Sequence, residues 1–254
     1  MYAAERQQAI RREAQRSGRV EVAALADKFE VSAETIRRDL GVLHEQGTLR
    51  RVHGGAILAE RLVSFERGLS ARSGVMAEQK RRIGRAALEL VPEGGTLYVE
   101  GGSTPGMFAE MLPEDLGLTV VTTGLPIALE LAGREGFTVH LVGGRIRRRS
   151  LAAVDDWAVD TLRGVRVDIA FLGTNGVSAE DGLSTPSSAE ATVKRAGLGI
   201  AEQTVLLADS TKINTRCLCR YGDCGDIDLL ITDDGVPARE IKRLRDTGVE
   251  VRVS

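Results

Sequence analysis

Cysteine is scarce in this 254-residue sequence, which has only Cys217, Cys219 and Cys224. Because no histidine lies near these residues, they support neither a disulfide framework nor a four-ligand zinc site. We expect reduced thiols and no bound metal. Proline is also scarce, with 6 residues, and charged residues make up 28% of the chain. These values exclude collagen-like and disordered chains and leave a globular protein.

Long hydrophobic runs are absent as well. No run approaches the roughly 18 residues that a membrane span requires, and the N-terminus lacks the apolar core of a signal peptide. We therefore expect a cytoplasmic protein with no membrane partner. The 34 Lys and Arg residues nearly balance the 36 Asp and Glu residues, which gives a net charge of −2. No overall basic field attracts nucleic acid, so any surface that binds it must be local.

The hydrophobic pattern changes near residue 60 and divides the chain into three segments. Residues 1–58 have the pattern of short helices, and from residue 78 to residue 254 apolar β-rich runs alternate with helical stretches. Residues 59–77 lack sustained periodicity. We interpret them as a linker with room for one short element.

The first segment predicts three helices, one over residues 3–15, one from Val22 and one that Ser32 caps at its N-terminus. In the third helix Ile36, Leu40 and Leu43 recur at helical spacing and face inward. At 100° per residue, Glu34 and Arg38 point away from that stripe, with Thr35 and Arg37 on its flanks. This is the arrangement of a recognition helix in the major groove of DNA.

A short β-like run follows this helix and ends in two glycines. It predicts the hairpin wing of a winged helix, which places cations beside phosphates. The alternative is a helical cap whose arginines are merely solvated, but the helix spacing together with the wing favours DNA binding. The candidate DNA-binding residues are Ser32, Glu34, Thr35, Arg37, Arg38, Arg50, Arg51, His53 and Gly54.

The C-terminal segment predicts a parallel sheet covered by helices on both faces, an α/β fold of Rossmann-like type. We expect strands at 96–100, 118–122, 138–142, 167–172, 204–208 and 229–232, and helices at 78–90, 104–112 and 126–132. In such sheets ligands bind at the carboxyl ends of the strands.

Glycine, serine and threonine gather at those strand ends, as in residues 101–104, 122–124, 143–145 and 173–176. Each cluster alone is typical of a tight turn, but four at one sheet edge favour a site that cradles a phosphate. Neither a dinucleotide-binding nor a P-loop motif is present. Two pairs of charged residues have two interpretations, as site residues or as exposed ion pairs: Glu190 with Lys194, which are four residues apart, and Asp209 with Lys212.

Two further features of the sequence have more than one interpretation. The basic run at residues 145–149 is solvated, binds an anionic effector or contacts DNA, and Arg145 is the member that we assign to a ligand. Trp157 is interpreted as an anchor in the core or at an interface rather than as a stacking platform.

Several segments together resemble the DeoR-type bacterial transcriptional regulators. In the first 60 residues these are Leu25, Ala26, Phe29 and residues 31–40 (VSAETIRRDL) and 49–56 (LRRVHGGA). The resemblance extends over essentially the whole chain, at residues 100–104 (EGGST), 121–123 (VTT), 141–144 (LVGG), 168–173 (DIAFLG), 190–194 (EATVK) and 208–212 (ADSTK).

This resemblance implies an N-terminal winged helix-turn-helix and a C-terminal domain that resembles ribose-5-phosphate isomerase but senses a phosphorylated sugar instead of converting it. By the resemblance Ser103 and Thr104 hold the phosphate, and Lys194, Asp209 and Lys212 contact phosphate or sugar hydroxyls. The full set of candidate effector-binding residues is Glu100, Gly102, Ser103, Thr104, Thr122, Thr123, Gly144, Arg145, Gly173, Asn175, Glu190, Lys194, Asp209 and Lys212.

The sequence departs from the family pattern at four positions. Glu100 stands where the family has Asp, Ser103 where it has Thr, Thr123 where it has Asn, and Asp155 where a Gly is expected. The longer side chain at Glu100 and the lost amide at Thr123 change reach and hydrogen bonding, so the resemblance does not name the effector.

Our leading hypothesis is a repressor of a sugar uptake or catabolism operon. Its partners are double-stranded operator DNA on the nucleoid, a second or further copies of itself in a dimer or tetramer, and a phosphorylated sugar as effector, with no cofactor. Fructose 1-phosphate and related hexose or tagatose phosphates are the family-based choices for that effector.

Two other classes of protein are alternatives to this hypothesis. One is a phosphosugar isomerase that uses Glu100, Asp209 or Glu190 as general base, which leaves the N-terminal unit unexplained. The other is a structural DNA-binding protein without a ligand, against which the polar strand ends argue.

Overall fold

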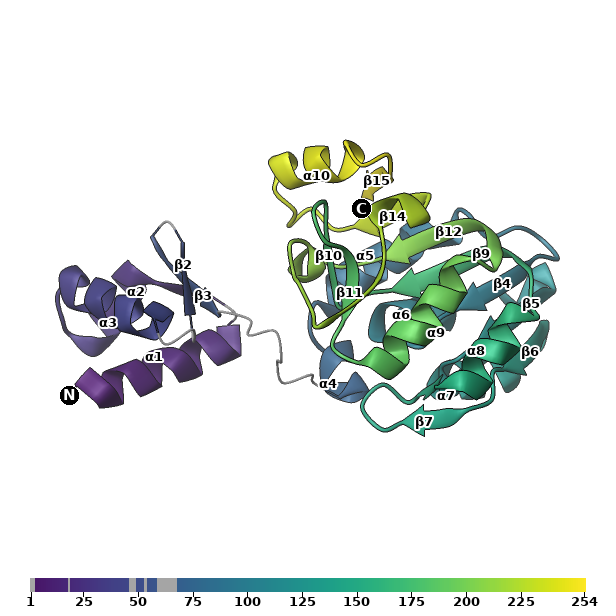
Figure 1. The fold of residues 1–254 in the computed structure, drawn as a ribbon, viewed down its shortest axis with the longest axis horizontal. Coiled ribbons are helices and arrows are strands. Elements are labelled where there is room, and N and C mark those ends of the chain that lie inside the picture. Colours follow the sequence, from purple (N-terminus) through teal and green to yellow (C-terminus); the bar gives the residue numbers. More distant parts are fainter. Residues whose placement is uncertain (1–2, 18, 46–48, 53, 59–67) are drawn as a thin grey trace. The chain divides into compact units, whose positions relative to one another are not determined.

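The computed structural model describes residues 3–17, 19–45, 49–52, 54–58 and 68–254 (Figure 1). The chain folds as two compact units, Met1–Ser64 and Phe65–Ser254. No helix in the described ranges is long and apolar enough to cross a membrane. The three cysteines are free thiols.

The first unit consists of three helices and a small sheet. The helices are α1 (Ala3–Ser17), α2 (Val22–Phe29) and α3 (Ala33–Glu45), and the strands are β1 (Arg19–Glu21), β2 (Leu49–Val52) and β3 (Gly55–Leu58). The antiparallel pair β2–β3 confirms the predicted wing, and β1, which the sequence pattern did not predict, pairs with the other edge of β3.

Burial of the predicted stripe holds these helices together. Ile36, Leu40 and Leu43 are buried in one cluster with Ile10 and Leu25, as their spacing requires. The predicted cap is also present, because the backbone N–H of Thr35 donates to Ser32 Oγ at 3.2 Å.

A buried ion pair ties α1 to α3. Arg6 Nε donates to Asp39 Oδ2 at 2.5 Å, and Gln7 Nε2 donates to Asp39 Oδ1 at 2.9 Å. Because Asp39 lies beside the buried stripe of α3, this contact fixes the rotation of the helix, and Arg37 and Arg38 lie on its exposed faces.

The second unit is built around a seven-stranded parallel sheet with the order β15-β14-β12-β9-β4-β5-β6. These strands are β4 (Thr96–Val99), β5 (Leu118–Thr122), β6 (Phe137–Leu141), β9 (Val167–Gly173), β12 (Ala201–Leu207), β14 (Leu229–Thr232) and β15 (Glu250–Val253). The helices are α4 (Leu69–Ser73), α5 (Ala77–Leu88), α6 (Ser103–Glu110), α7 (Leu125–Ala132), α8 (Asp156–Arg163), α9 (Ser188–Leu198) and α10 (Ala238–Arg245), with 3₁₀ turns at Glu114–Leu116, Ser210–Lys212 and Cys224–Asp226. The predicted Rossmann-like sheet is confirmed.

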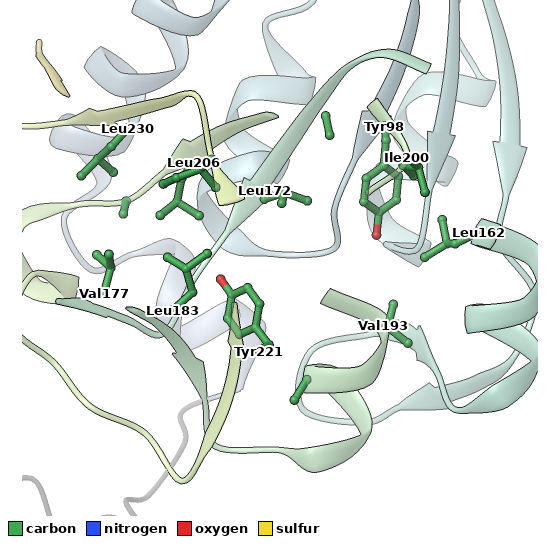
Figure 2. Close-up of a cluster of buried hydrophobic side chains, with 14 of the residues drawn as sticks. Tyr98, Leu162, Leu172, Val177, Leu183, Val193, Ile200, Leu206, Tyr221 and Leu230 are labelled. Carbon is green, nitrogen blue, oxygen red and sulfur yellow. The ribbon is translucent and has the colours of Figure 1, made fainter. Parts of the chain in front are cut away.

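Two hydrophobic cores cover the two faces of this sheet. Because side chains alternate along a strand, Leu97 and Val99 of β4 pack against α5, α6 and α7, whereas Tyr98 faces the core that α8 and α9 share. Figure 2 shows this second core, where Tyr98 lies near Leu162 of α8 and Tyr221 lies near Leu183.

Shorter strands complete the unit. They form a hairpin of β7 (Arg145–Arg147) and β8 (Ala152–Val154) and a sheet of β10 (Gly176–Ser178), β11 (Gly182–Thr185) and β13 (Cys219–Gly222). The sequence pattern did not predict these five strands. Helix α4 is the short element for which the predicted linker had room.

The alternative that Trp157 is a core anchor is wrong. The side chain sits in the first turn of α8 and is 80% exposed, because the buried face of that helix carries Ala158, Val159 and Leu162 instead.

Candidate nucleic-acid interface and effector site

The outward face of α3 carries the predicted base-reading residues together. Glu34, Arg37 and Arg38 are exposed and Thr35 is partly exposed. Arg37 Nη1 lies 3.1 Å from Glu34 Oε2, and the Thr35 hydroxyl lies 2.9 Å from Ser32 Oγ. Both contacts are at the solvent surface, where water or a DNA base edge can replace them at small cost.

The wing is described through its backbone. Arg50 and Arg51 lie in β2, and Gly54 has a φ of +77°, as the tight turn requires. The Gly54 carbonyl accepts from Val22 N–H at 2.9 Å, which joins the wing to the start of α2. His53 lies outside the described residues.

The second unit gathers its candidate residues where four neighbouring strands end. Glu100 follows β4, Thr123 follows β5, Gly173 ends β9 and Asp209 comes just after β12. Since these strands are adjacent in the order β12-β9-β4-β5, the four positions lie along one edge of the sheet.

A buried ion pair forms the centre of this edge. Lys194 Nζ from α9 donates to Glu100 Oε2 at 2.7 Å and to the Gly173 carbonyl at 2.8 Å, and the Gly173 N–H donates to the same carboxylate oxygen at 2.9 Å. Burial raises the pKa of Glu100, and the positive charge of Lys194 opposes that rise. Tyr221 covers the ammonium group, with Nζ 5.4 Å from its ring centroid.

Glu190 lies one helical turn before Lys194 but has different partners. Its carboxylate accepts from Arg147 Nη1 at 3.3 Å and from Thr185 Oγ1 at 3.1 Å. Burial alone would raise the pKa of Glu190, but the charges of Lys194 and Arg147 and the hydrogen bonds lower it overall. The alternative of an exposed Glu190–Lys194 pair is therefore wrong, because both side chains are buried.

Two threonines at the end of β5 fix the end of β4 and the loop between β4 and α6. Thr123 Oγ1 accepts from Gly101 N–H at 3.1 Å, and Thr122 Oγ1 donates to the Val99 carbonyl at 2.6 Å. A Cβ on Gly101 would lie 2.7 Å from Ala152 Cβ, so only glycine lets this loop approach the hairpin. Helix α6 then begins at Ser103, where the first backbone N–H groups have no partner inside the helix.

A second cluster of charged residues surrounds Asp209. The sequence pattern predicted Asp209 and Lys212 as site residues but not Lys80 or Arg72. Lys80 Nζ from α5 donates to the carbonyls of Arg72 and Val75 at 2.6 Å each. Burial lowers the pKa of Lys80 to about 8; the charge of Asp209 opposes this, and the charges of Lys212 and Arg72 add to it. Arg72 Nε and Nη2 are buried and have no hydrogen-bond partner among the described residues.

Sequence signals for this cluster were weak. Arg72 lies in the segment predicted as a linker, so nothing pointed to it. Lys80 lies on the buried face of the helix predicted over 78–90, and a lysine on an apolar helical stripe is the signal that could have identified it.

The remaining predicted residues differ in whether they join the cluster around Glu190. Arg145 is 62% exposed on its side chain and pairs with Asp155 at 2.6 Å, whereas Arg147, which the sequence left unassigned, reaches Glu190. Asn175 is joined to the cluster, since its Oδ1 lies 3.0 Å from Thr185 Oγ1. Gly144 packs against α8, because a Cβ there would lie 3.3 Å from Ala158 Cβ.

The fold and these sites define a transcriptional regulator with a winged helix-turn-helix unit and a sensor unit. Residues 6–61 match the model of the DeoR-like helix-turn-helix domain, and residues 75–234 match the DeoR C terminal sensor domain. The chain therefore belongs to the DeoR family of transcriptional regulators. The isomerase alternative is not supported, because the matched family and its named relatives are regulators.

Two curated relatives match nearly end to end. The chain is 32% identical to the putative aga operon transcriptional repressor of Escherichia coli O157:H7, over 97% of this chain and 92% of the relative. It is 30% identical to the glycerol-3-phosphate regulon repressor of Escherichia coli strain K12, over 93% of each. A solved ribose 5-phosphate isomerase from Methanocaldococcus jannaschii matches with a TM-score of 0.40 and 18% identity over 54% of this chain and 55% of that chain.

Proposed function

We propose that this protein is a sequence-specific, cytoplasmic repressor of a sugar uptake or catabolism operon and that a phosphorylated sugar releases it from its operator. The observation that carries the proposal is the set of cations beside Asp209. Among the described residues, Arg72 has two buried nitrogen atoms without a hydrogen-bond partner, and the charge of Lys212 lies close enough to Lys80 to lower the pKa of that lysine. A bound phosphate would satisfy these groups.

The phosphate would lie between these cations and the N-terminus of α6. The first backbone N–H groups of that helix, with the hydroxyls of Ser103 and Thr104, provide donors of the kind that hold a phosphate. No cofactor is needed, since the protein supplies both the charges and the donors.

The sugar would lie over the buried ion pair. Glu100, Glu190 and Asn175 offer acceptors and Lys194 offers a donor, a set that matches hydroxyl groups, which both donate and accept. Hexose and tagatose phosphates, fructose 1-phosphate among them, are the first effectors to test.

Release would follow from a population shift. The effector lowers operator affinity only to the extent that it binds the DNA-incompetent arrangement more tightly than the competent one. An oligomer would present α3 of each copy to repeated half-sites of the operator.

Calorimetry with a panel of sugar phosphates tests the site. We expect one of them to bind the parent chain, its unphosphorylated sugar to bind far more weakly, and Arg72→Gln to weaken binding of the phosphate about tenfold or more, the loss of one charged hydrogen bond. Arg163→Gln on α8 is the matched control and should leave the affinity unchanged. Equal binding of a sugar with and without phosphate, or an unaffected Arg72→Gln variant, would contradict the proposed site.

A further inference from the structure

Helix α4 is the first helix or strand of the sensor unit that the structure describes, and it has no hydrophobic core of its own. None of its five residues is buried. Residues 59–68 separate it in sequence from β3, the last strand of the winged helix-turn-helix unit. A helix this short is unstable by itself in water, so the contacts made at its two ends decide whether it stays in place.

The C-terminal end of α4 is held by the buried side chain of Lys80. The ammonium group of this lysine donates to the carbonyls of Arg72, in the last turn of α4, and of Val75, at 2.6 Å each. Helix α4 also packs against α6, whose first backbone N–H groups belong to the proposed phosphate subsite. Two parts of that subsite, Lys80 and α6, therefore also hold this end of α4.

The N-terminal end of α4 is held by the β7–β8 hairpin. The Leu69 N–H donates to the Arg149 carbonyl at 2.8 Å. Arg149 lies two residues after Arg147, whose Nη1 is 3.3 Å from the Glu190 carboxylate in the proposed sugar subsite. The two ends of α4, labelled in Figure 1, are thus joined to the two halves of the proposed effector site.

Like charges oppose the docking of α4 when no anion is bound. Burial is the main cause of the lowered pKa of Lys80, and the charges of Lys212 and Arg72 lower it further, against the attraction of Asp209. Arg72 brings its charge to this place on α4. A bound phosphate would attract all three cations and would supply acceptors to the two buried nitrogens of Arg72. Phosphate should therefore bind a docked α4 more tightly than a released one.

We propose that α4 transmits effector binding to the winged helix-turn-helix unit. A bound phosphorylated sugar holds α4 on the sensor unit, and a docked α4 fixes the chain where it enters that unit. Docked and released α4 are the two states whose populations the effector changes. This inference rests on the proposed function, because it uses the same phosphate and sugar subsites, and it adds the element that responds to them.

Hydrogen exchange of the full chain tests whether an anion holds α4, with inorganic phosphate as the probe. Its dissociation constant comes from a calorimetric titration, and chloride at equal ionic strength is the comparison. If only docked α4 binds phosphate, the amides of residues 69–76 should exchange about tenfold more slowly at about ten times that constant. Helix α10 is the internal reference and should exchange at an unchanged rate.

Leu69→Pro tests transmission, because it removes the N–H that donates to Arg149 and no side chain of the proposed site. Leu69 is the first residue of α4, a position that suits proline, and Gly68 already has the φ of −59° and ψ of 160° that a residue before proline adopts. Leu69→Ala keeps the N–H and is the matched control.

Anisotropy on the DNA upstream of the gene measures the operator affinity of these variants with and without each sugar phosphate of the panel, fructose 1-phosphate first. Leu69→Pro should bind the operator and the sugar phosphate like the parent, but the effector-induced loss of operator affinity should be at least about tenfold smaller, a typical size for coupling between sites. Leu69→Ala should keep the full loss.

The outcomes separate this inference from the proposed function. Parent-like release of Leu69→Pro by the sugar phosphate, or unchanged exchange over residues 69–76 while phosphate is bound, would overturn the role of α4 and leave the proposed effector site in place. A parent chain that binds neither phosphate nor any sugar phosphate would contradict the proposed function, and this inference with it.

Discussion

At the scale of single residues, the sensor unit places charge inside the protein. Three buried charged side chains lie close to one another: Glu100, Glu190 and Lys194. Lys80 is also buried, and its ammonium group donates to the Arg72 carbonyl. The sequence could predict the first three because they follow strand ends or share a helix face. It could not predict Arg147, because its contact with Glu190 joins segments 43 residues apart in the chain. Arg72 lies in a segment without periodicity, and for Lys80 the only signal was its place on an apolar helical stripe.

If phosphate binds at the proposed site, the depressed pKa of Lys80 should make its affinity depend on pH. Bound phosphate favours the charged lysine, so above a pKa of about 8 binding must take up a proton. We expect the affinity for the sugar phosphate to be constant from pH 7 to 8 and then to fall by up to about tenfold per pH unit. Titration calorimetry across this range measures the slope.

Lys80→Arg supplies the control for this prediction. Arginine stays charged throughout the range, so the slope above pH 8 should disappear in this variant. A slope of equal size in the variant and the parent would exclude Lys80 as its source.

Asp155 occupies a backbone conformation that favours glycine, with a φ of 75° and a ψ of −174°. Its side chain pairs with the exposed Arg145, a contact of small energetic value. We expect Asp155→Gly to raise the free energy of unfolding of the sensor unit by about 1 kcal/mol. Asp156→Gly in the first turn of α8 should lower it by about 1 kcal/mol, and both are measured by urea unfolding at one protein concentration. Loss of stability in both variants would contradict strain at Asp155.

At the scale of elements, helices and strands with strong hydrophobic periodicity are the ones that a sequence predicts best. The start of the third helix and six of the seven strands of the main sheet were predicted to within three residues, because a long stripe or an apolar run is repeated over several residues. The edge strand β15 was not predicted. Strands β7, β8, β10, β11 and β13 have only three or four residues each, and all except β8 contain arginine, glycine or serine. Long-range pairing, rather than local pattern, fixes them.

The outward face of α3 should carry base recognition. We expect Arg38→Ala and Arg37→Ala to weaken binding to the operator by about 1–3 kcal/mol where the guanidinium contacts a base, with little change on unrelated DNA. Arg12→Ala, at an exposed position of α1, is the matched control. Fluorescence anisotropy on both DNA sequences at fixed salt measures the difference. Parent-like affinity of both arginine variants for the operator would refute this role of α3.

At the scale of the whole molecule, one chain combines a DNA-binding unit with a sensor unit, each with its own core. The sequence resemblance predicted this combination, since its motifs lie in both units. The particular sugar lies beyond the resemblance, because Glu100, Ser103 and Thr123 depart from the family pattern at the positions that would contact it.

The most direct test of the account is the anisotropy of the full chain on the DNA upstream of its own gene, titrated with a panel of phosphorylated sugars at fixed salt. The account predicts specific binding that one sugar phosphate reverses and that the corresponding free sugar leaves intact. Specific binding that no sugar phosphate alters would contradict it and would remove Ser103, Lys194 and Lys212 from the role of effector contacts.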